Sequence, residues 1–253
     1  PEDIPSPIKM EGEMDDKPPH FRKHFKGTGC GNEKYDFNSI DDLGWKTIIS
    51  KYYGMISLID DNVGRIVNAL REEGILEDTI IMLTSDHGEL MGDHGILFKG
   101  PFHYDGLIRV PFIIRWGNNV GHGSRCNEIT QHVDIMPTIL ELTSTQIPSS
   151  VQGRSVGPLL RGDRGAGYQF ALVEHNCNDW GLNLKTIRSK EWKLTYYAGQ
   201  ECGELYDLKN DPDEFVNLWD NVDYREVREK LKSKLLDRLI ETEDCIPIRE
   251  KKY

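Results

Sequence analysis

Apolar residues recur every three or four positions between residues 44 and 73, and this spacing predicts one long amphipathic helix. Gly74 follows the last apolar position and is placed to end the helix. Residues 79–84 and 110–115 are different, because each is a short and almost unbroken apolar run. Such runs are typical of strands that are buried on both faces, as in a parallel sheet. The middle of the chain therefore reads as α/β.

The two ends of the chain have other patterns. Residues 1–43 show little periodicity and are expected to form an irregular loop segment, while five glycines and a proline at 153–167 indicate a boundary. The remaining predicted elements are a helix at 134–142 with Asp134 as N-cap, strands at 170–174, 185–188, 192–197 and 204–208, and a closing helix at 224–243. We expect an α/β domain over residues 1–160, followed by a small α+β subdomain over 161–253 with an antiparallel sheet and a terminal helix.

Composition and charge narrow the possible partners. The 253 residues carry a net charge of -11 with 38% apolar residues, which is the composition of a globular protein. That acidity argues against binding to nucleic acid or to an anionic membrane surface, because both would repel the chain. No apolar run approaches the ~20 residues of a spanning helix. Five widely spaced cysteines do not indicate a disulfide framework. The first residues include neither an initiator Met nor a signal peptide, so we expect the chain to begin inside a longer protein.

Candidate chemistry is concentrated in residues 84–99, which begin where an apolar strand is predicted to end. Ligands collect at such strand ends in open α/β sheets. Asp86 and His87 offer an oxygen and a nitrogen side by side, and Gly88 allows close approach of the backbone. A hard divalent cation needs about six ligands, so others would have to come from elsewhere. An Asp-His-Gly turn that only ends a strand is the alternative.

Several ordered motifs resemble those of the sulfatases, which are arylsulfatase-like members of the alkaline phosphatase-like superfamily. No motif alone would be specific, but together they span roughly residues 44–244. They are Thr84-Ser-Asp-His-Gly-Glu89, Gly92-Asp-His-Gly95, Lys99, Arg109-Val-Pro111, Val133-Asp-Ile-Met-Pro-Thr138, Gly153-Arg-Ser155, Glu204-Leu-Tyr-Asp-Leu208 and Asp211-Pro-Asp-Glu214. The resemblance implies part of an alkaline phosphatase-like α/β sandwich.

The resemblance also implies roles for three of these residues. Asp86 and His87 would be metal ligands, and Lys99 would be the catalytic and substrate-binding residue that holds the sulfate. Cleavage of a sulfate ester builds negative charge, which a divalent cation and an ammonium group can both offset. The metal implied is Ca²⁺, although an imidazole ligand leaves Mg²⁺ or Mn²⁺ open. His94 would brace the loop.

Three further residues are candidates for contact with the substrate. His103 lies close enough to Lys99 to face the pocket, and His175 ends a predicted strand of the subdomain and could reach a sugar or ring of the substrate. Trp180 is the third candidate for contact with the substrate. Ordinary surface placement is the alternative for each histidine.

Two parts of the family's active site are not found. Its nucleophile is a formylglycine made in a Cys-x-Pro-x-Arg motif, and the one match, Cys245 to Arg249, lies beyond the last predicted helix, far from the family's position. The family's pair of adjacent aspartates follows a buried strand, and no aspartate pair here does. We therefore expect the formylglycine and the remaining metal ligands in a missing N-terminal portion of the same protein.

These motifs indicate a metal-dependent sulfatase that hydrolyses a sulfated small molecule or carbohydrate, represented here by an incomplete C-terminal portion that is inactive alone. A phosphoester or phosphonate monoester hydrolase of the same superfamily is an alternative, and so is a non-catalytic binding or structural fragment. By family resemblance the protein would be periplasmic, secreted or lysosomal.

Overall fold

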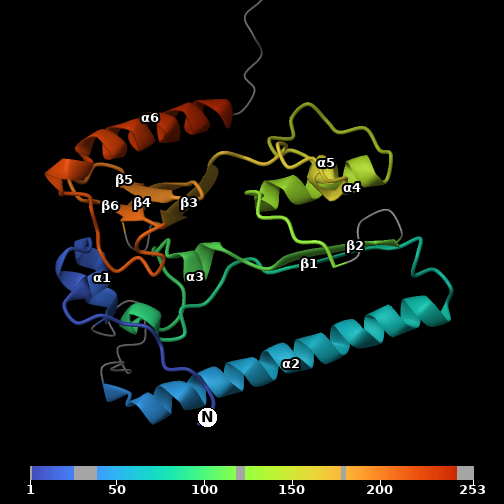
Figure 1. Ribbon diagram of the computed structural model, residues 1–253, viewed down its shortest axis with the longest axis horizontal. Coiled ribbons are helices and arrows are strands. Elements are labelled where there is room, and N and C mark those ends of the chain that lie inside the picture. The colour runs from blue at the N-terminus through green and yellow to red at the C-terminus, as the bar shows by residue number, and fades with distance from the viewer. Residues whose placement is uncertain (1, 26–38, 118–122, 178–180, 244–253) are drawn as a thin grey trace, which may run out of the picture.

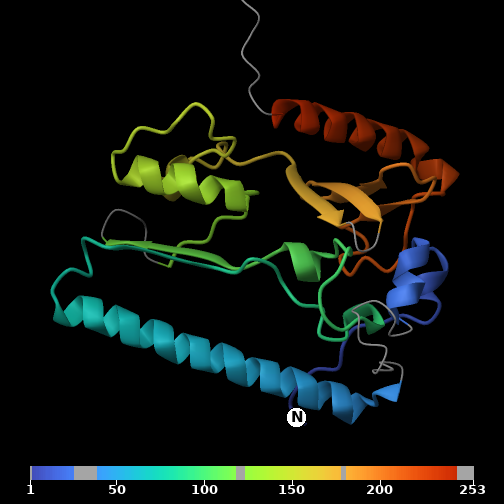
Figure 2. The ribbon, with the colours of Figure 1, turned by 180° about the vertical axis from the view of Figure 1, so that it is seen from behind.

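The computed structural model describes residues 2–25, 39–117, 123–177 and 181–243. Two sheets organise it, and each has helices beside it (Figures 1 and 2). The helices are α1 (Pro19–Phe25), α2 (Asp42–Glu72), α3 (Asp105–Ile108), α4 (Ile135–Leu142), α5 (Gly157–Leu160) and α6 (Arg225–Glu241). The strands are β1 (Ile80–Thr84), β2 (Phe112–Trp116), β3 (Ala171–Cys177), β4 (Leu182–Arg188), β5 (Trp192–Tyr197) and β6 (Gly203–Asp207).

The long helix predicted from the apolar spacing is confirmed as α2. The Asp41 carboxylate caps its start by accepting from the Gly44 amide at 2.8 Å, and Gly74 follows its end with φ at 70°. Much of its apolar surface is uncovered, since Leu58 and Ile66 are 62% and 60% exposed. In both views α2 runs along one side of the β1–β2 pair, while α4 and α5 lie on the other side.

The prediction of parallel, doubly buried strands is wrong for this structure. β1 and β2 pair antiparallel, with Ile80 opposite Trp116 and Thr84 opposite Phe112. All of β1 is only half-buried, and Ile113 of β2 is 58% exposed. An unbroken apolar run indicates that both faces of a strand are apolar and favour burial. It does not indicate whether the strand pairs parallel or antiparallel. Among the described residues no further strand extends this sheet.

Two local expectations are also corrected. The N-terminal segment is not irregular throughout, because α1 forms there and buries Phe21 completely. Asp134 is the N-cap residue of α4 by position, as predicted, but its side chain makes no capping hydrogen bond to that helix. Its carboxylate instead accepts from the Gln131 and Arg154 amides and from the Tyr168 hydroxyl, at 2.7–2.9 Å. It therefore fixes three segments that are distant in sequence.

The C-terminal antiparallel sheet and terminal helix are confirmed. The strand order is β3-β4-β5-β6, and α6 covers one face of the sheet (Figure 1). Side chains alternate between the two faces, so Leu194 of β5 packs toward α6 with Leu231 and Leu235. Burial of this apolar interface is what holds α6 in place.

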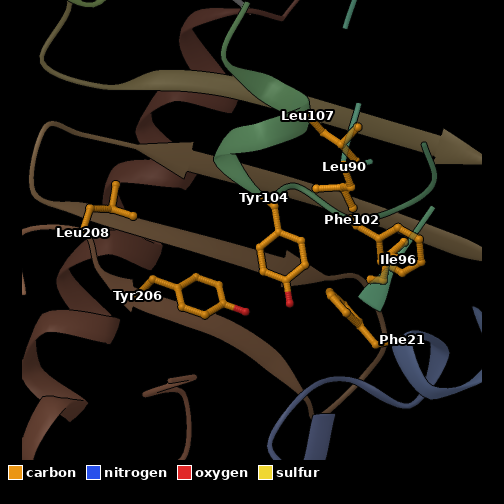
Figure 3. Close-up of a cluster of buried hydrophobic side chains, with 8 residues drawn as sticks. All are labelled: Phe21, Leu90, Ile96, Phe102, Tyr104, Leu107, Tyr206 and Leu208. Carbon is orange, nitrogen blue, oxygen red and sulfur yellow. The ribbon is translucent and has the colours of Figure 1, made fainter. Parts of the chain in front are cut away.

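The opposite face of this sheet packs on the loop that follows β1. Figure 3 shows the cluster, in which Tyr206 and Leu208, at and just beyond the end of β6, lie with Phe21 of α1 and with side chains from the loop and α3. The loop and α3 members are Leu90, Ile96, Phe102, Tyr104 and Leu107. This core joins the loop bearing Lys99 to the C-terminal sheet.

A buried charged cluster lies beside this core. Lys193 on β5 is 1% exposed, pairs with Glu214 and donates to the His103 carbonyl. Glu214 also accepts from the Asp105 amide at 2.6 Å. Lys17 is buried close by and donates to the carbonyls of Glu214 and Phe215. Because unpaired buried charges are costly, each of these groups depends on the others.

Other sequence expectations are not tested. The division between residues 160 and 161 stays a prediction, and Trp180 and the Cys245–Arg249 motif lie outside the described residues. In the part of the chain that is described, no helix has both the length and the apolarity to cross a membrane.

We expect Lys193→Met to lower the free energy of unfolding by about 3–5 kcal/mol, because it leaves the buried Glu214 carboxylate without its cation. Urea denaturation of the chain measures this change. Lys230→Met on exposed α6 surface is the matched control and should change stability by less than about 0.5 kcal/mol. Equal effects of the two substitutions would show that the buried pair does not hold the fold.

Candidate active site

The candidate site begins at the end of β1. Asp86 and His87 lie in the turn after the strand, and the Gly88 amide donates to the Leu107 carbonyl at 2.8 Å. A Cβ atom on Gly88 would lie 1.9 Å from the Gly106 carbonyl oxygen. Only glycine allows this approach, which holds the turn against α3.

The two ring nitrogens of His87 have different partners. Nδ1 lies 2.7 Å from the Gly88 carbonyl oxygen, which can only accept, so Nδ1 carries the proton. Nε2 is then the acceptor, and the Lys99 ammonium donates to it at 2.8 Å. A backbone carbonyl that fixes one nitrogen of an imidazole is the usual support for a histidine whose other nitrogen binds a metal.

Asp86 and His87 could supply part of a metal-ligand set. Asp86 Oδ2 lies 3.5 Å from His87 Nε2, so an oxygen and a nitrogen converge. The His87 amide donates to the Asp86 carboxylate at 3.0 Å, and this bond lowers the pKa of Asp86 and keeps it ionised. The described residues contain no group of three or more acidic, His or Cys side chains that could hold a metal. The pair therefore fits a divalent cation only as part of a larger shell.

The loop from β1 to Lys99 is fixed by buried contacts. His94 has a left-handed backbone with φ at 57°, stacks on Tyr104 at 3.8 Å between ring centroids, and lies 3.2 Å from Glu13. The expectation that His94 braces the loop is thus confirmed. These contacts hold the backbone at Lys99. The Lys99 side chain itself is exposed, so its ammonium group is accessible at the surface.

The structure brings all five predicted site residues to one cavity of about 1870 Å³. The cavity lies between the β1–β2 pair, α3, α5 and β3, and its lining includes Asp86, His87, Lys99, His103 and His175. The direct contacts are among the first three, and the two remaining histidines lie near each other, with ring centroids 6.2 Å apart. Their placement in a shared cavity leaves their roles as predictions.

His103 is a buried histidine rather than a surface one. It is 6% exposed, and its Nδ1 lies 2.7 Å from the Thr186 hydroxyl, which in turn lies 2.7 Å from the Thr195 hydroxyl. Burial, with nearby Lys193 as a second cause, lowers the pKa of His103 to about 3. The ring is therefore neutral at physiological pH and is held in one orientation by the C-terminal sheet.

Sequence reasoning missed the residues that position the site from the C-terminal sheet. Arg188 on β4 donates to both oxygens of Asp105 at 2.9 and 2.7 Å, and Thr186 fixes His103. The only sequence signal for these positioning residues was the alternation of polar and apolar residues in β4 and β5. Alternation alone does not tell which face of a sheet is buried.

Two family models match the chain. The model described as "Sulfatase" matches residues 12–145, and the model described as "N-sulphoglucosamine sulphohydrolase, C-terminal" matches residues 92–241. Together they cover both sheets and the loop that bears Asp86, His87 and Lys99.

Individual proteins are similar over most of this chain. An N-acetylglucosamine-6-O-sulfatase of Bacteroides thetaiotaomicron is 32% identical over 199 residues, which are 75% of this chain and 35% of that protein. The structure of a phosphonate monoester hydrolase of Agrobacterium radiobacter matches with a TM-score of 0.85 and 29% identity, over 96% of this chain and 52% of that one. A protein solved with its substrate D-glucosamine-2-N,6-O-disulfate shares the fold, with a TM-score of 0.75 and 24% identity, over 96% of this chain and 54% of that one. The chain spans about a third to a half of these proteins.

Protonation of His103 should make the fold sensitive to acid. Its pKa is lower in the folded state than the 6.5 of a free histidine, so between about pH 6.5 and 3 the unfolded chain binds a proton that the folded chain does not. This contribution to stability is complete above pH 6.5 and is lost as the pH falls. At pH 5 the loss is about 2 kcal/mol, at ~1.4 kcal/mol per pH unit.

We expect His103→Asn to remove this part of the pH dependence, since an amide can keep the bond to Thr186 without titrating. Urea denaturation at pH 7.5 and pH 5.0 measures the difference. The wild-type chain should lose about 2 kcal/mol more than the variant between these pH values. Parallel losses in the two proteins would contradict a neutral, buried His103.

Proposed function

This chain belongs to the sulfatase family, and we propose that it forms the C-terminal part of a metal-dependent enzyme that hydrolyses the sulfate ester of a small molecule or carbohydrate. The observation that carries this proposal is the convergence of Asp86, His87 and Lys99 at the end of β1. The names of relatives that act on sulfated sugars support this substrate class.

We propose that Asp86 and His87 hold a divalent cation, with Ca²⁺ first and Mg²⁺ or Mn²⁺ as alternatives. The ionised carboxylate suits a hard cation, and the lone pair of His87 Nε2, which accepts from the Lys99 ammonium in this structure, would turn to the cation when Lys99 moves to the sulfate. When bound, such a cation would draw negative charge from the sulfuryl group. The remaining ligands would come from the missing N-terminal portion.

Lys99 supplies a positive charge beside the proposed cation ligands. Its ammonium group lies 2.8 Å from His87 Nε2 and faces the cavity. It can donate to a sulfate oxygen and stabilise the charge that grows as the ester bond breaks. The buried contacts of the loop on both sides of Lys99 hold its backbone, so only the exposed side chain has to leave His87 Nε2 when a cation and a sulfate bind.

We propose that the rest of the protein supplies the formylglycine nucleophile and covers α2 and the β1–β2 pair. Met55, Leu58 and Ile66 of α2 are each more than half exposed, and an isolated two-stranded sheet is only marginally stable. Large apolar surfaces of this kind mark sites of contact with protein. The formylglycine is expected from the family alone.

Hydrolysis of a phosphonate monoester is the second candidate. The phosphonate monoester hydrolase of Agrobacterium radiobacter matches this fold with a higher TM-score than the glucosamine disulfate-binding protein does, and its sequence is 29% identical. An aspartate, a histidine and a lysine can serve either ester, because both reactions build charge on a tetrahedral anion.

The proposed activity predicts that the complete protein, and not this chain alone, hydrolyses 4-nitrophenyl sulfate. A chelator should abolish the turnover and Ca²⁺ should restore it, because the cation offsets charge in the transition state. The matched substrate is 4-nitrophenyl phenylphosphonate, a phosphonate monoester, assayed by release of the same product. Faster cleavage of the phosphonate would favour the second candidate, and no cleavage of either ester or of any sugar sulfate would favour a non-catalytic protein.

In the complete protein, Lys99→Ala should lower kcat/KM for 4-nitrophenyl sulfate by about 10²–10³-fold, as expected when a charge that stabilises the transition state is removed. Circular dichroism and thermal unfolding should be unchanged, since the Lys99 side chain is exposed. Lys209→Ala, at an exposed position in the turn after β6, is the control and should retain full activity. A near-normal rate for Lys99→Ala would remove this residue from the site.

A further inference from the structure

His175 has a buried nitrogen atom without a hydrogen-bond partner. The ring is partly exposed and lines the cavity, but its Nε2 is covered and unpaired among the described residues. An unmade hydrogen bond of this kind costs roughly 1–3 kcal/mol. A bound molecule that reached Nε2 with a hydroxyl group would supply the missing partner.

The sheet register places His175 on the face that meets the active site. On β3, His175 lies opposite Leu184 of β4, and Val173 lies opposite Thr186. Because residues two apart on a strand share a face, His175 and Thr186 point to the same side. Thr186 is the residue that holds His103, so the two imidazoles meet at the cavity from the loop and from the sheet.

The net charge of the two imidazole rings determines which type of chemical group they could bind. Burial lowers the pKa of His175, as it does for His103, so both imidazoles are neutral at physiological pH. A neutral imidazole is both a donor and an acceptor, which matches a hydroxyl group. A neutral imidazole has no net charge with which to attract an anion. The negative charge of the sulfate would instead be bound by Lys99.

On the basis of the proposed sulfatase function, we propose that His175 binds a hydroxyl group of a carbohydrate beside the sulfate ester and thereby sets a preference for sugar sulfates over aryl sulfates. An aryl group offers no such hydroxyl and would leave Nε2 unpaired. Sites built to hydrogen-bond a substrate hydroxyl discriminate strongly against analogues that lack it. His175 would then be a specificity-determining residue supplied by the C-terminal sheet.

The test compares two substrate classes in the complete protein. Values of kcat/KM are measured for 4-methylumbelliferyl sulfate and for the best substrate in a panel of hexose and hexosamine O-sulfates. His175→Ala should lower kcat/KM on the sugar sulfate by about 10- to 100-fold and leave the aryl sulfate within twofold, because one hydrogen bond to the substrate is lost. His175→Gln keeps a donor and an acceptor and should recover part of the loss.

Asn176→Ala is the matched control, since the neighbouring position on β3 points to the opposite face and is exposed. It should leave both substrates unaffected. An unchanged rate on the sugar sulfate, an equal loss on both substrates, or turnover of the aryl sulfate alone by the wild-type protein would each overturn the role of His175 while leaving the sulfatase activity intact. Failure of the wild-type protein to cleave any sulfate ester would instead overturn the proposed function, and this inference with it.

Discussion

The buried pairing of Lys193 with Glu214 is the interaction on which the arrangement of the site depends. Lys193 belongs to the C-terminal sheet, and the same ammonium group binds the carbonyl of His103, four residues after Lys99. Glu214 in turn holds the first amide of α3. Water does not reach the buried Lys193 side chain and cannot replace its protein partners. The sheet and the loop are therefore held in one relative position. The loop that bears Lys99 is thus positioned by the C-terminal sheet that follows it in sequence.

The sequence predicted the elements with the strongest periodicity, and it singled out residues that the structure brings to one cavity. The long helix, the C-terminal antiparallel strands and the terminal helix are all present. His87 lies close to both Asp86 and Lys99, because a strand end and a short loop fix local geometry, while the roles given to these residues stay predictions. In these places local pattern and tertiary structure agree.

The parts that could not be predicted depend on long-range contacts. The antiparallel direction of β1 and β2 is set by the route of the chain between the two strands, and not by their apolar content. Asp134 looked like a helix cap, yet its carboxylate binds Arg154 and Tyr168, which are 20 and 34 residues away. The burial of His103 was likewise hidden, because the threonine that holds it is 83 residues later. No local spacing encodes such partners.

Contacts between the first and last parts of the described chain bear on how the protein folds during synthesis. Lys17 binds the Glu214 carbonyl across a separation of 197 residues, and Asn217 binds Asp16 across 201. Closing so long a loop is entropically costly and must precede these bonds. The segment around α1 therefore reaches its final place only after β6 and the following turn have left the ribosome. Until then Phe21 lacks two members of its buried cluster, Tyr206 and Leu208, so part of its apolar surface remains in water.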